Sequence, residues 1–144
     1  MLLDKDNLDE IKFYLQFHQV INADETVLSA HKPGEGNMNY MLRLNLPGRS
    51  LLIKQARPYV EKYPASPAPE ERVIIDGEFY KKAATNDELR AAMPVLIKVD
   101  KENHILILED LGEANDFTFL YEQGFQLTEK EAYSLGSFLS VLHN

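Results

Sequence analysis

The sequence between residues 38 and 56 constrains the fold more than any other part of the chain. Residues 38–46 place apolar side chains on one face and mostly polar ones on the other, the period-two pattern of a half-buried strand. Pro47 and Gly48 suit the centre of a type II turn, after which residues 50–56 return as a second strand. With another strand expected at 26–32, two consecutive antiparallel hairpins are predicted.

The turn of the first predicted hairpin reads Gly-Glu-Gly-Asn-Met-Asn over residues 34–39. Glycines let a backbone approach phosphates closely, and successive N–H groups can then close over them. The two asparagine side chains can hold the shape of the loop or bind phosphate. An alternative is that glycine and asparagine only supply positive φ angles in a hairpin turn.

Lys54 lies in the strand that follows, on the same face as Leu52 and Ala56. An ammonium group on an apolar face is costly unless an anion meets it, and a lysine on this third strand can reach nucleotide phosphates. The alternative is an edge lysine whose charged end extends into solvent. The glycine loop and Lys54 together indicate a nucleotide-binding lobe of the kinase type.

The rest of the chain is predicted to mix helices and strands, which gives an α+β class. A helix at 7–21 begins with Asn7 and Glu10 as a capping pair, and a helix after Thr128 begins with a Thr128–Glu131 capping box. Other expected elements are an extended proline-rich connector at 57–71, a helix at 70–85, strands at 94–99 and 104–109, and a short helical segment at 115–123.

The helix at 70–85 contains a glycine, Gly77, which costs about 1 kcal/mol relative to alanine unless close packing requires it. Its packed side is predicted to consist of Ile74, Ile75, Phe79 and Ala83. The final helix carries an apolar stripe that nothing downstream covers, so we expect the natural protein to continue past Asn144.

Composition excludes several classes of function. The net charge of −8 argues against general nucleic-acid binding, and the absence of cysteine excludes disulfides and thiolate catalysis. No apolar run approaches the roughly 18 residues that span a bilayer, and the N-terminus lacks the features of a secretory signal. We therefore expect no membrane partner and a cytoplasmic location.

The loop at 34–40 and the run Ile-Lys-Gln-Ala-Arg-Pro-Tyr-Val at 53–60 resemble the methylthioribose kinase family. That family belongs to the aminoglycoside phosphotransferase and choline kinase group, which is protein-kinase-like. The resemblance implies an N-terminal lobe with a five-stranded antiparallel sheet plus helix, followed by a hinge and the first helices of a truncated C-terminal lobe. The implied divisions are an N-terminal helix at 1–23, an ATP-binding small lobe at 24–110, and the hinge with the start of the large lobe at 111–144.

The resemblance also implies roles for individual residues. Lys54 would pair with phosphate oxygens while an acidic residue of the following helix holds it in place; Glu78 is the first candidate, with Glu71 or Asp76 as alternatives. Backbone groups of the hinge would bind adenine. The implied ATP-binding residues are Gly34, Gly36, Asn37, Asn39, Lys54, Glu78, Glu109 and Leu111. No catalytic or metal-binding residue is expected in this chain, because the family's catalytic aspartate and Mg²⁺ ligands lie downstream.

The leading hypothesis is therefore the ATP-binding part of a kinase that phosphorylates a hydroxyl of a small metabolite, with methylthioribose as the favoured acceptor. The chain alone is expected to be inactive. One alternative is a non-catalytic nucleotide-binding or regulatory module with the same fold. Another is a structural interaction domain, and the expected partners beyond ATP and the metabolite are a C-terminal lobe or a second copy of the chain.

Overall fold

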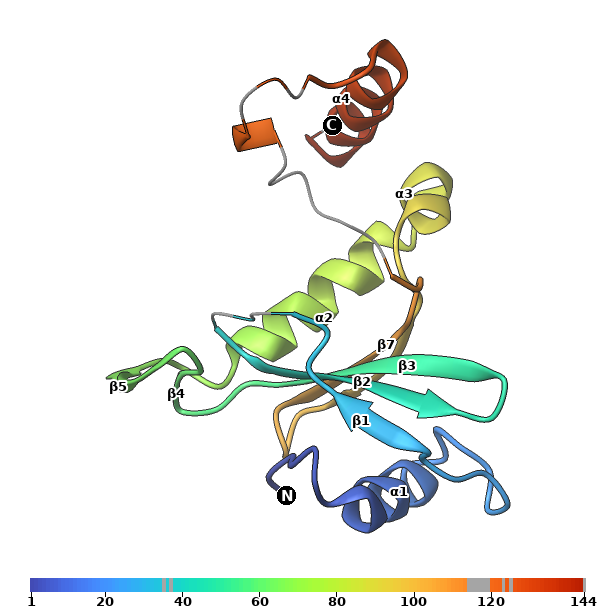
Figure 1. The fold of residues 1–144 in the computed structure, drawn as a ribbon, viewed down its shortest axis with the longest axis vertical. Helices are drawn as coiled ribbons and strands as arrows, with labels where there is room; N and C mark the ends of the chain where they lie inside the picture. The colour runs from blue at the N-terminus through green and yellow to red at the C-terminus, as the bar shows by residue number, and fades with distance from the viewer. Residues whose placement is uncertain (35, 37, 114–119, 123, 125, 144) are drawn as a thin grey trace.

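The fold was analysed in a computed structural model that describes residues 1–34, 36, 38–113, 120–122, 124 and 126–143. Its centre is a five-stranded antiparallel sheet in the order β1-β2-β3-β7-β6 (Figure 1). These strands are β1 (Ser29–His31), β2 (Tyr40–Leu46), β3 (Arg49–Gln55), β6 (Leu96–Asp100) and β7 (Ile105–Glu109). The α+β class and the five-stranded antiparallel sheet are confirmed.

The hairpin of β2 and β3 has the predicted form. Alternate residues of β2 are buried, and Leu46 pairs with Arg49 across the turn. Gly48 has a φ of 78°, as the third position of a type II turn requires. The first strand is shorter than the predicted 26–32, because only Ser29–His31 pair with β2.

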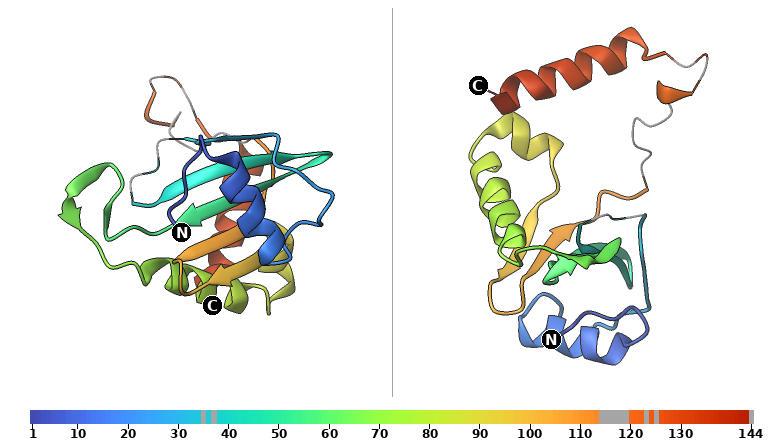
Figure 2. Two further views of the ribbon diagram at one scale, coloured as in Figure 1. Left: turned by 90° about the horizontal axis from the view of Figure 1, so that it is seen from below. Right: turned by 90° about the vertical axis from the view of Figure 1, so that its left-hand side faces the viewer.

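The sheet buries a different apolar cluster on each face. On β7, Ile105 and Ile107 join a cluster that includes residues of α1 (Leu8–Phe17), whereas Leu106 and Leu108 pack with Val73 of α2 (Arg72–Ala83). Figure 2 shows the two helices on opposite sides of the sheet. Because both faces are covered, β7 reads as a continuous apolar run instead of an alternating one.

The N-terminal segment is tied to the sheet by the buried side chain of Gln55. Its amide oxygen accepts from the N–H of Leu3 at 2.8 Å, and its amide nitrogen donates to the carbonyls of Met1 at 2.9 Å and Asn103 at 3.0 Å. The predicted capping pair is also present, since the Asn7 side chain accepts from the N–H of Glu10. The helix ends at Phe17, before the predicted residue 21.

Gly77 of α2 sits against β6. A Cβ at this position would lie 2.7 Å from Cγ2 of Val99, so the glycine is there for close packing. The predicted helix at 70–85 is in fact shorter, and a second helix, α3 (Asp87–Ala92), follows it. Asn86 separates the two, because its extended backbone and side-chain bonds to the N–H groups of Glu88 and Leu89 begin a new helix.

The proline-rich connector contains a short hairpin that was not predicted, formed by β4 (Tyr59–Val60) and β5 (Tyr63–Pro67). Pro67 lies at the end of an edge strand, where a missing N–H is tolerated. The hairpin projects from the side of the sheet in Figure 1.

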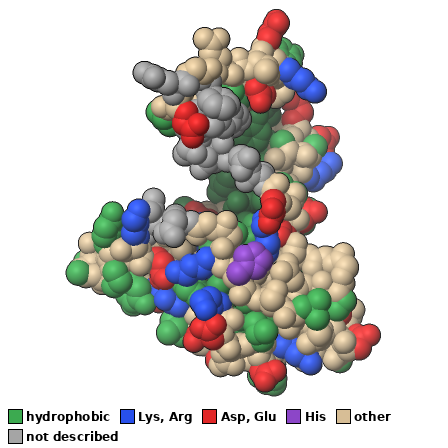
Figure 3. Space-filling model, in the orientation of Figure 1, with side chains coloured by type: hydrophobic (Ala, Val, Ile, Leu, Met, Phe, Trp, Pro, Cys, Tyr) green, Lys and Arg blue, Asp and Glu red, His purple; other side chains and the backbone are tan. Residues whose placement is uncertain are grey.

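The last helix, α4 (Glu129–His143), begins with the predicted capping box: Thr128 Oγ1 accepts from the N–H of Glu131, whose carboxylate accepts from the N–H of Thr128. None of its residues is buried, although Leu135 and Phe138 line a hollow together with Ala92 of α3. Figure 3 shows hydrophobic side chains in the recess beside this end of the molecule. Most of the short helical segment predicted at 115–123 lies outside the described residues. No helix in the described part of the chain has the length and apolar character needed to cross a membrane.

Candidate functional site

Lys54 projects from β3 on the sheet face that α2 covers, flanked across the strands by Met41 and Leu106. Its ammonium group forms an ion pair with the carboxylate of Asp76 on α2. The Lys54 side chain is 21% exposed and that of Asp76 is 38% exposed, so the pair is reachable from solvent. The predicted placement of Lys54 with Leu52 and Ala56 is confirmed, and one carboxylate from the following helix meets it.

That carboxylate belongs to Asp76 and not to Glu78, so the preferred partner was wrong and one of the two alternatives is right. Glu78 instead accepts from Lys81 at 2.8 Å, a hydrogen bond that lowers the pKa of Glu78. Residues two apart on a helix point about 200° away from each other, so Asp76 and Glu78 cannot both face the sheet. Glu71, the other alternative, precedes the first residue of α2.

The packed side of α2 was predicted in part. Ala83 is buried and Ile74 packs against the apolar cluster, as predicted. Ile75 and Phe79, also predicted to pack, are 69% and 45% exposed, whereas Val73 and Gly77 are buried. Asp76 lies three residues after Val73 and so shares its side of the helix. Gly77 was the available signal, because a glycine kept for close packing marks the face that touches the sheet.

The loop before β2 brings Gly36 close to Asn39. The N–H of Gly36 donates to the carbonyl of Gly34 at 3.0 Å, and a Cβ at Gly36 would lie 3.2 Å from the Asn39 carbonyl oxygen. The described glycines with positive φ are Gly48, Gly112 and Gly124, which gives no support to a turn-only role for this loop. Asn37 lies outside the described residues.

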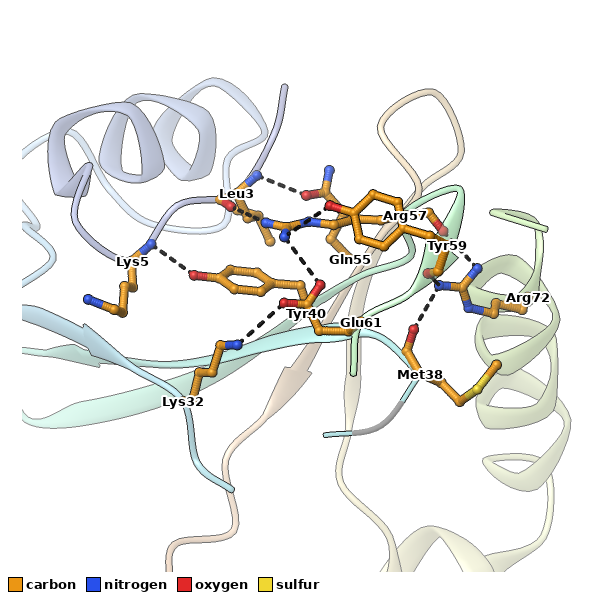
Figure 4. Close-up of polar contacts among 10 residues, drawn as sticks. All are labelled: Leu3, Lys5, Lys32, Met38, Tyr40, Gln55, Arg57, Tyr59, Glu61 and Arg72. Carbon is orange, nitrogen blue, oxygen red and sulfur yellow. Dashed lines mark hydrogen bonds and ion pairs between the residues drawn. The ribbon is translucent and has the colours of Figure 1, made fainter. Parts of the chain in front are cut away.

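Asn39 forms a hydrogen bond with Arg72, a residue for which the sequence predicted no role. The side-chain oxygen of Asn39 accepts from Nε of Arg72, the first residue of α2, at 2.7 Å. Nη2 of the same arginine donates to the carbonyl of Met38 at 2.9 Å (Figure 4). Arg72 is 33 residues from Asn39 and 34 residues from Met38 in the chain. Local sequence patterns cannot predict contacts over such a separation.

Arg57 lies two residues after β3 and is largely buried. Its guanidinium lies 4.0 Å from the centre of the Tyr40 ring and donates to the Leu3 carbonyl at 2.8 Å and to Glu61 at 3.2 Å. Figure 4 shows these contacts together. The side chain is only 14% exposed, so Arg57 fixes the N-terminal segment to the sheet.

The expected adenine-binding segment begins where β7 ends. The N–H of Glu109 donates to the carbonyl of Val95 at 2.9 Å, and the Glu109 carboxylate accepts from the N–H of Val95. Leu111 is exposed. Of the two backbone groups of Glu109, the N–H is therefore already used within the sheet.

Between these two residues lies a buried ion pair that sequence reasoning missed. The Asp110 carboxylate lies 2.6 Å from Nε of Arg43 and accepts from the Ser50 hydroxyl at 2.6 Å and from the N–H of Gly112 at 3.0 Å. Burial by itself would raise the pKa of Asp110, but the hydrogen bonds from Ser50 and Arg43 outweigh it and lower the pKa. The cluster joins β2 and β3 to the segment after β7.

Two hollows of the described structure lie away from Lys54. One of about 310 Å³ is formed by α2, α3 and the start of β6, and one of about 710 Å³ lies between α3 and α4. Among the described residues no group of three or more His, Asp or Glu side chains is placed to hold a metal ion.

Comparison with known proteins relates the chain to a kinase-like family. Methylthioribose kinases of Bacillus cereus are similar to it: that of strain B4264 is 33% identical over 100 residues, which cover 69% of this chain and 25% of the relative, and that of strain G9842 is 30% identical over the same extent. The enzyme of strain ATCC 10987 is 33% identical over 83 residues. No family model matches the chain. The chain spans about a quarter of the length of these relatives.

Proposed function

We propose that this chain is the ATP-binding part of a small-molecule kinase, whose favoured phosphoryl acceptor is methylthioribose. The observation that carries the proposal is the ion pair of Lys54 and Asp76 on the sheet face next to the glycine loop. A lysine held by one acidic residue of the following helix can neutralise nucleotide phosphates. The relatives at 30–33% identity are kinases, which supports the same function.

Each residue has a proposed role. Backbone groups of Gly34 and Gly36, with Asn37 and Asn39, would contact the phosphates, and Lys54 would neutralise them. Asp76 takes the positioning role first given to Glu78. The carbonyl of Glu109 and the N–H of Leu111 would bind the adenine edge. The acceptor pocket, the catalytic aspartate and the Mg²⁺ ligands are expected in the parent enzyme outside this chain.

The test is a titration of the chain with Mg·ATP, followed by amide NMR. We expect shifts at residues 34–40, 54 and 107–111, and weaker binding by Lys54→Ala. Lys81→Ala is the matched control, since it removes an equal charge from the exposed pair with Glu78. Absence of shifts at millimolar ATP, both here and in a longer polypeptide that adds the remaining lobe, would refute the proposal.

The exposed apolar residues of α4 favour a second candidate, a structural interaction domain that docks on a partner or on a second copy. None of the residues of this helix is buried, and Leu139 is exposed. This candidate predicts a stable oligomer by analytical ultracentrifugation and no dependence on nucleotide. A non-catalytic nucleotide-binding module would instead bind ATP as a monomer or dimer without transferring phosphate.

A further inference from the structure

Arg72 occupies a central position between the glycine loop, the connector and α2. Its guanidinium donates to the Met38 carbonyl and the Asn39 side chain, to the carbonyls of Arg57 at 2.9 Å and Tyr59 at 3.2 Å, and to the Pro69 carbonyl. Figure 4 shows this side chain reaching back from α2 towards Met38 and Tyr59. A planar guanidinium can hold several oxygens in a fixed arrangement, which a lysine cannot.

These oxygens carry no formal charge. The ion pairs that involve arginine in the described part of the chain are formed by Arg43, Arg49, Arg57 and Arg90. Among the described residues no carboxylate forms an ion pair with Arg72, so its positive charge stands beside the loop. A retained cation next to backbone N–H groups favours an anion at the same place.

The contacts of Arg72 act on the part of the loop that reaches the glycines. The Met38 carbonyl is held twice, since it also accepts from the N–H of Glu61 at 3.4 Å. Asn39 in turn lies close to Gly36, since a Cβ added at Gly36 would lie 3.2 Å from the Asn39 carbonyl oxygen. Fixing Asn39 thus limits where Gly36 can lie.

Arg72 and Asp76 lie one helical turn apart, at positions i and i+4 of α2. Arg72 holds the loop and Asp76 holds Lys54, so one helix carries both halves of the phosphate site. We propose that Arg72 is a positioning residue that sets the glycine loop at a fixed place relative to Lys54 and adds positive charge there. This inference rests on the proposed ATP-binding function.

The test compares Arg72→Gln and Arg72→Lys with the wild-type chain, using Arg90→Gln as a control because the Arg90 side chain is 61% exposed and pairs with Asp87 of the same helix. Hydrogen exchange at residues 38–41 should rise about tenfold in Arg72→Gln, because the hydrogen bonds to the Met38 carbonyl and the Asn39 side chain are lost, while exchange in β7 stays unchanged. Arg72→Lys keeps the charge but should leave the loop equally unprotected.

Binding supplies the second readout. Arg72→Gln should weaken ATP by about tenfold and adenosine much less, because the loop acts on the phosphates alone. A purely structural role would weaken both ligands alike. Unchanged exchange and unchanged ATP affinity in Arg72→Gln, with Lys54→Ala weakened, would overturn the inference and leave the proposed function standing.

If the wild-type chain binds no ATP, the proposed function is refuted. Hydrogen exchange at residues 38–41 then still tests whether Arg72 positions the loop. Wild-type protection at residues 38–41 in Arg72→Gln would overturn that role. Wild-type protection from exchange at these residues in Arg72→Lys would show that the planar guanidinium is not required to hold the loop. Loss of protection confined to the loop in both variants would support the role.

Discussion

Arg43 and Asp110 meet at 2.6 Å in a buried ion pair that ties β2 to the residue after β7. Asp110 lies inside the segment proposed to bind adenine, between Glu109 and Leu111. Asp110 is buried, since its side chain is only 1% exposed. Its carboxylate also accepts hydrogen bonds from the Ser50 hydroxyl and the Gly112 N–H. The contacts of Asp110 with Arg43 and Ser50 therefore fix the direction in which the chain leaves the sheet after β7.

Asp110→Asn should destabilise the chain by about 3 kcal/mol at neutral pH, because the largely buried Arg43 loses its buried counter-charge and keeps the exposed Glu113 carboxylate at 3.9 Å. The measurement is urea unfolding. Asp87→Asn is the control: Asp87 pairs with Arg90 on the surface, where little stability is at stake. An Asp110→Asn variant as stable as the wild type would contradict the importance of the pair.

The contribution of Asp110 should also appear in the pH dependence of the unfolding free energy. The pKa of Asp110 is lower in the folded chain than in the unfolded one, so its contribution is complete above the ordinary carboxyl pKa of about 3.9 and is lost as the pH falls through the lowered value. The difference in unfolding free energy between wild type and Asp110→Asn should therefore shrink below about pH 4. A constant difference down to pH 2 would contradict this assignment.

The two carboxylates of α2 can be separated by mutation. Asp76→Asn should weaken ATP by about tenfold, because Lys54 loses the group that holds it. Glu78→Gln should bind ATP as the wild type does, since Glu78 contacts Lys81. Calorimetric titration distinguishes the two, and equal losses in both variants would argue against Asp76 as the specific partner.

Gly77→Ala should destabilise the fold by about 1–3 kcal/mol, because the added methyl group overlaps Val99. Gly136→Ala in α4 is the matched control: nothing lies within 4 Å of the added Cβ, and it should stabilise the helix slightly. Thermal unfolding of both variants, with Gly77→Ala/Val99→Ala as a rescue, checks the contact. A Gly77→Ala chain that melts at the wild-type temperature would show that β6 yields easily.

Gly36→Glu should lose ATP binding while the chain stays folded, because the added side chain crowds Asn39 and places a negative charge where phosphates are proposed to lie. Gly34→Ala should bind nearly as well as the wild type, since open space surrounds that position. The shifts of the ATP titration and the circular dichroism spectrum report the two properties separately. Retained affinity in Gly36→Glu would count against the loop assignment.

The sequence allowed some features to be predicted well and others not at all. The β2–β3 hairpin and the Thr128 capping box depend on neighbours in the chain, so alternation and capping residues were enough. The packed side of α2 was predicted only in part, because Ile74 and Ala83 pack as expected but Ile75 and Phe79 are apolar yet exposed. Arg72 and Asp110 depend on partners more than 30 residues away, which a single sequence does not reveal.

The anchoring of the N-terminal segment has a consequence for the order of folding. Leu3 is fully buried, and the group that accepts its N–H is the side chain of Gln55, which is itself fixed by the carbonyl of Asn103. Contacts between such distant positions form slowly, because a long loop must close before they contribute. We expect the segment around Leu3 to reach its final place late, after the sheet that carries Gln55 has formed.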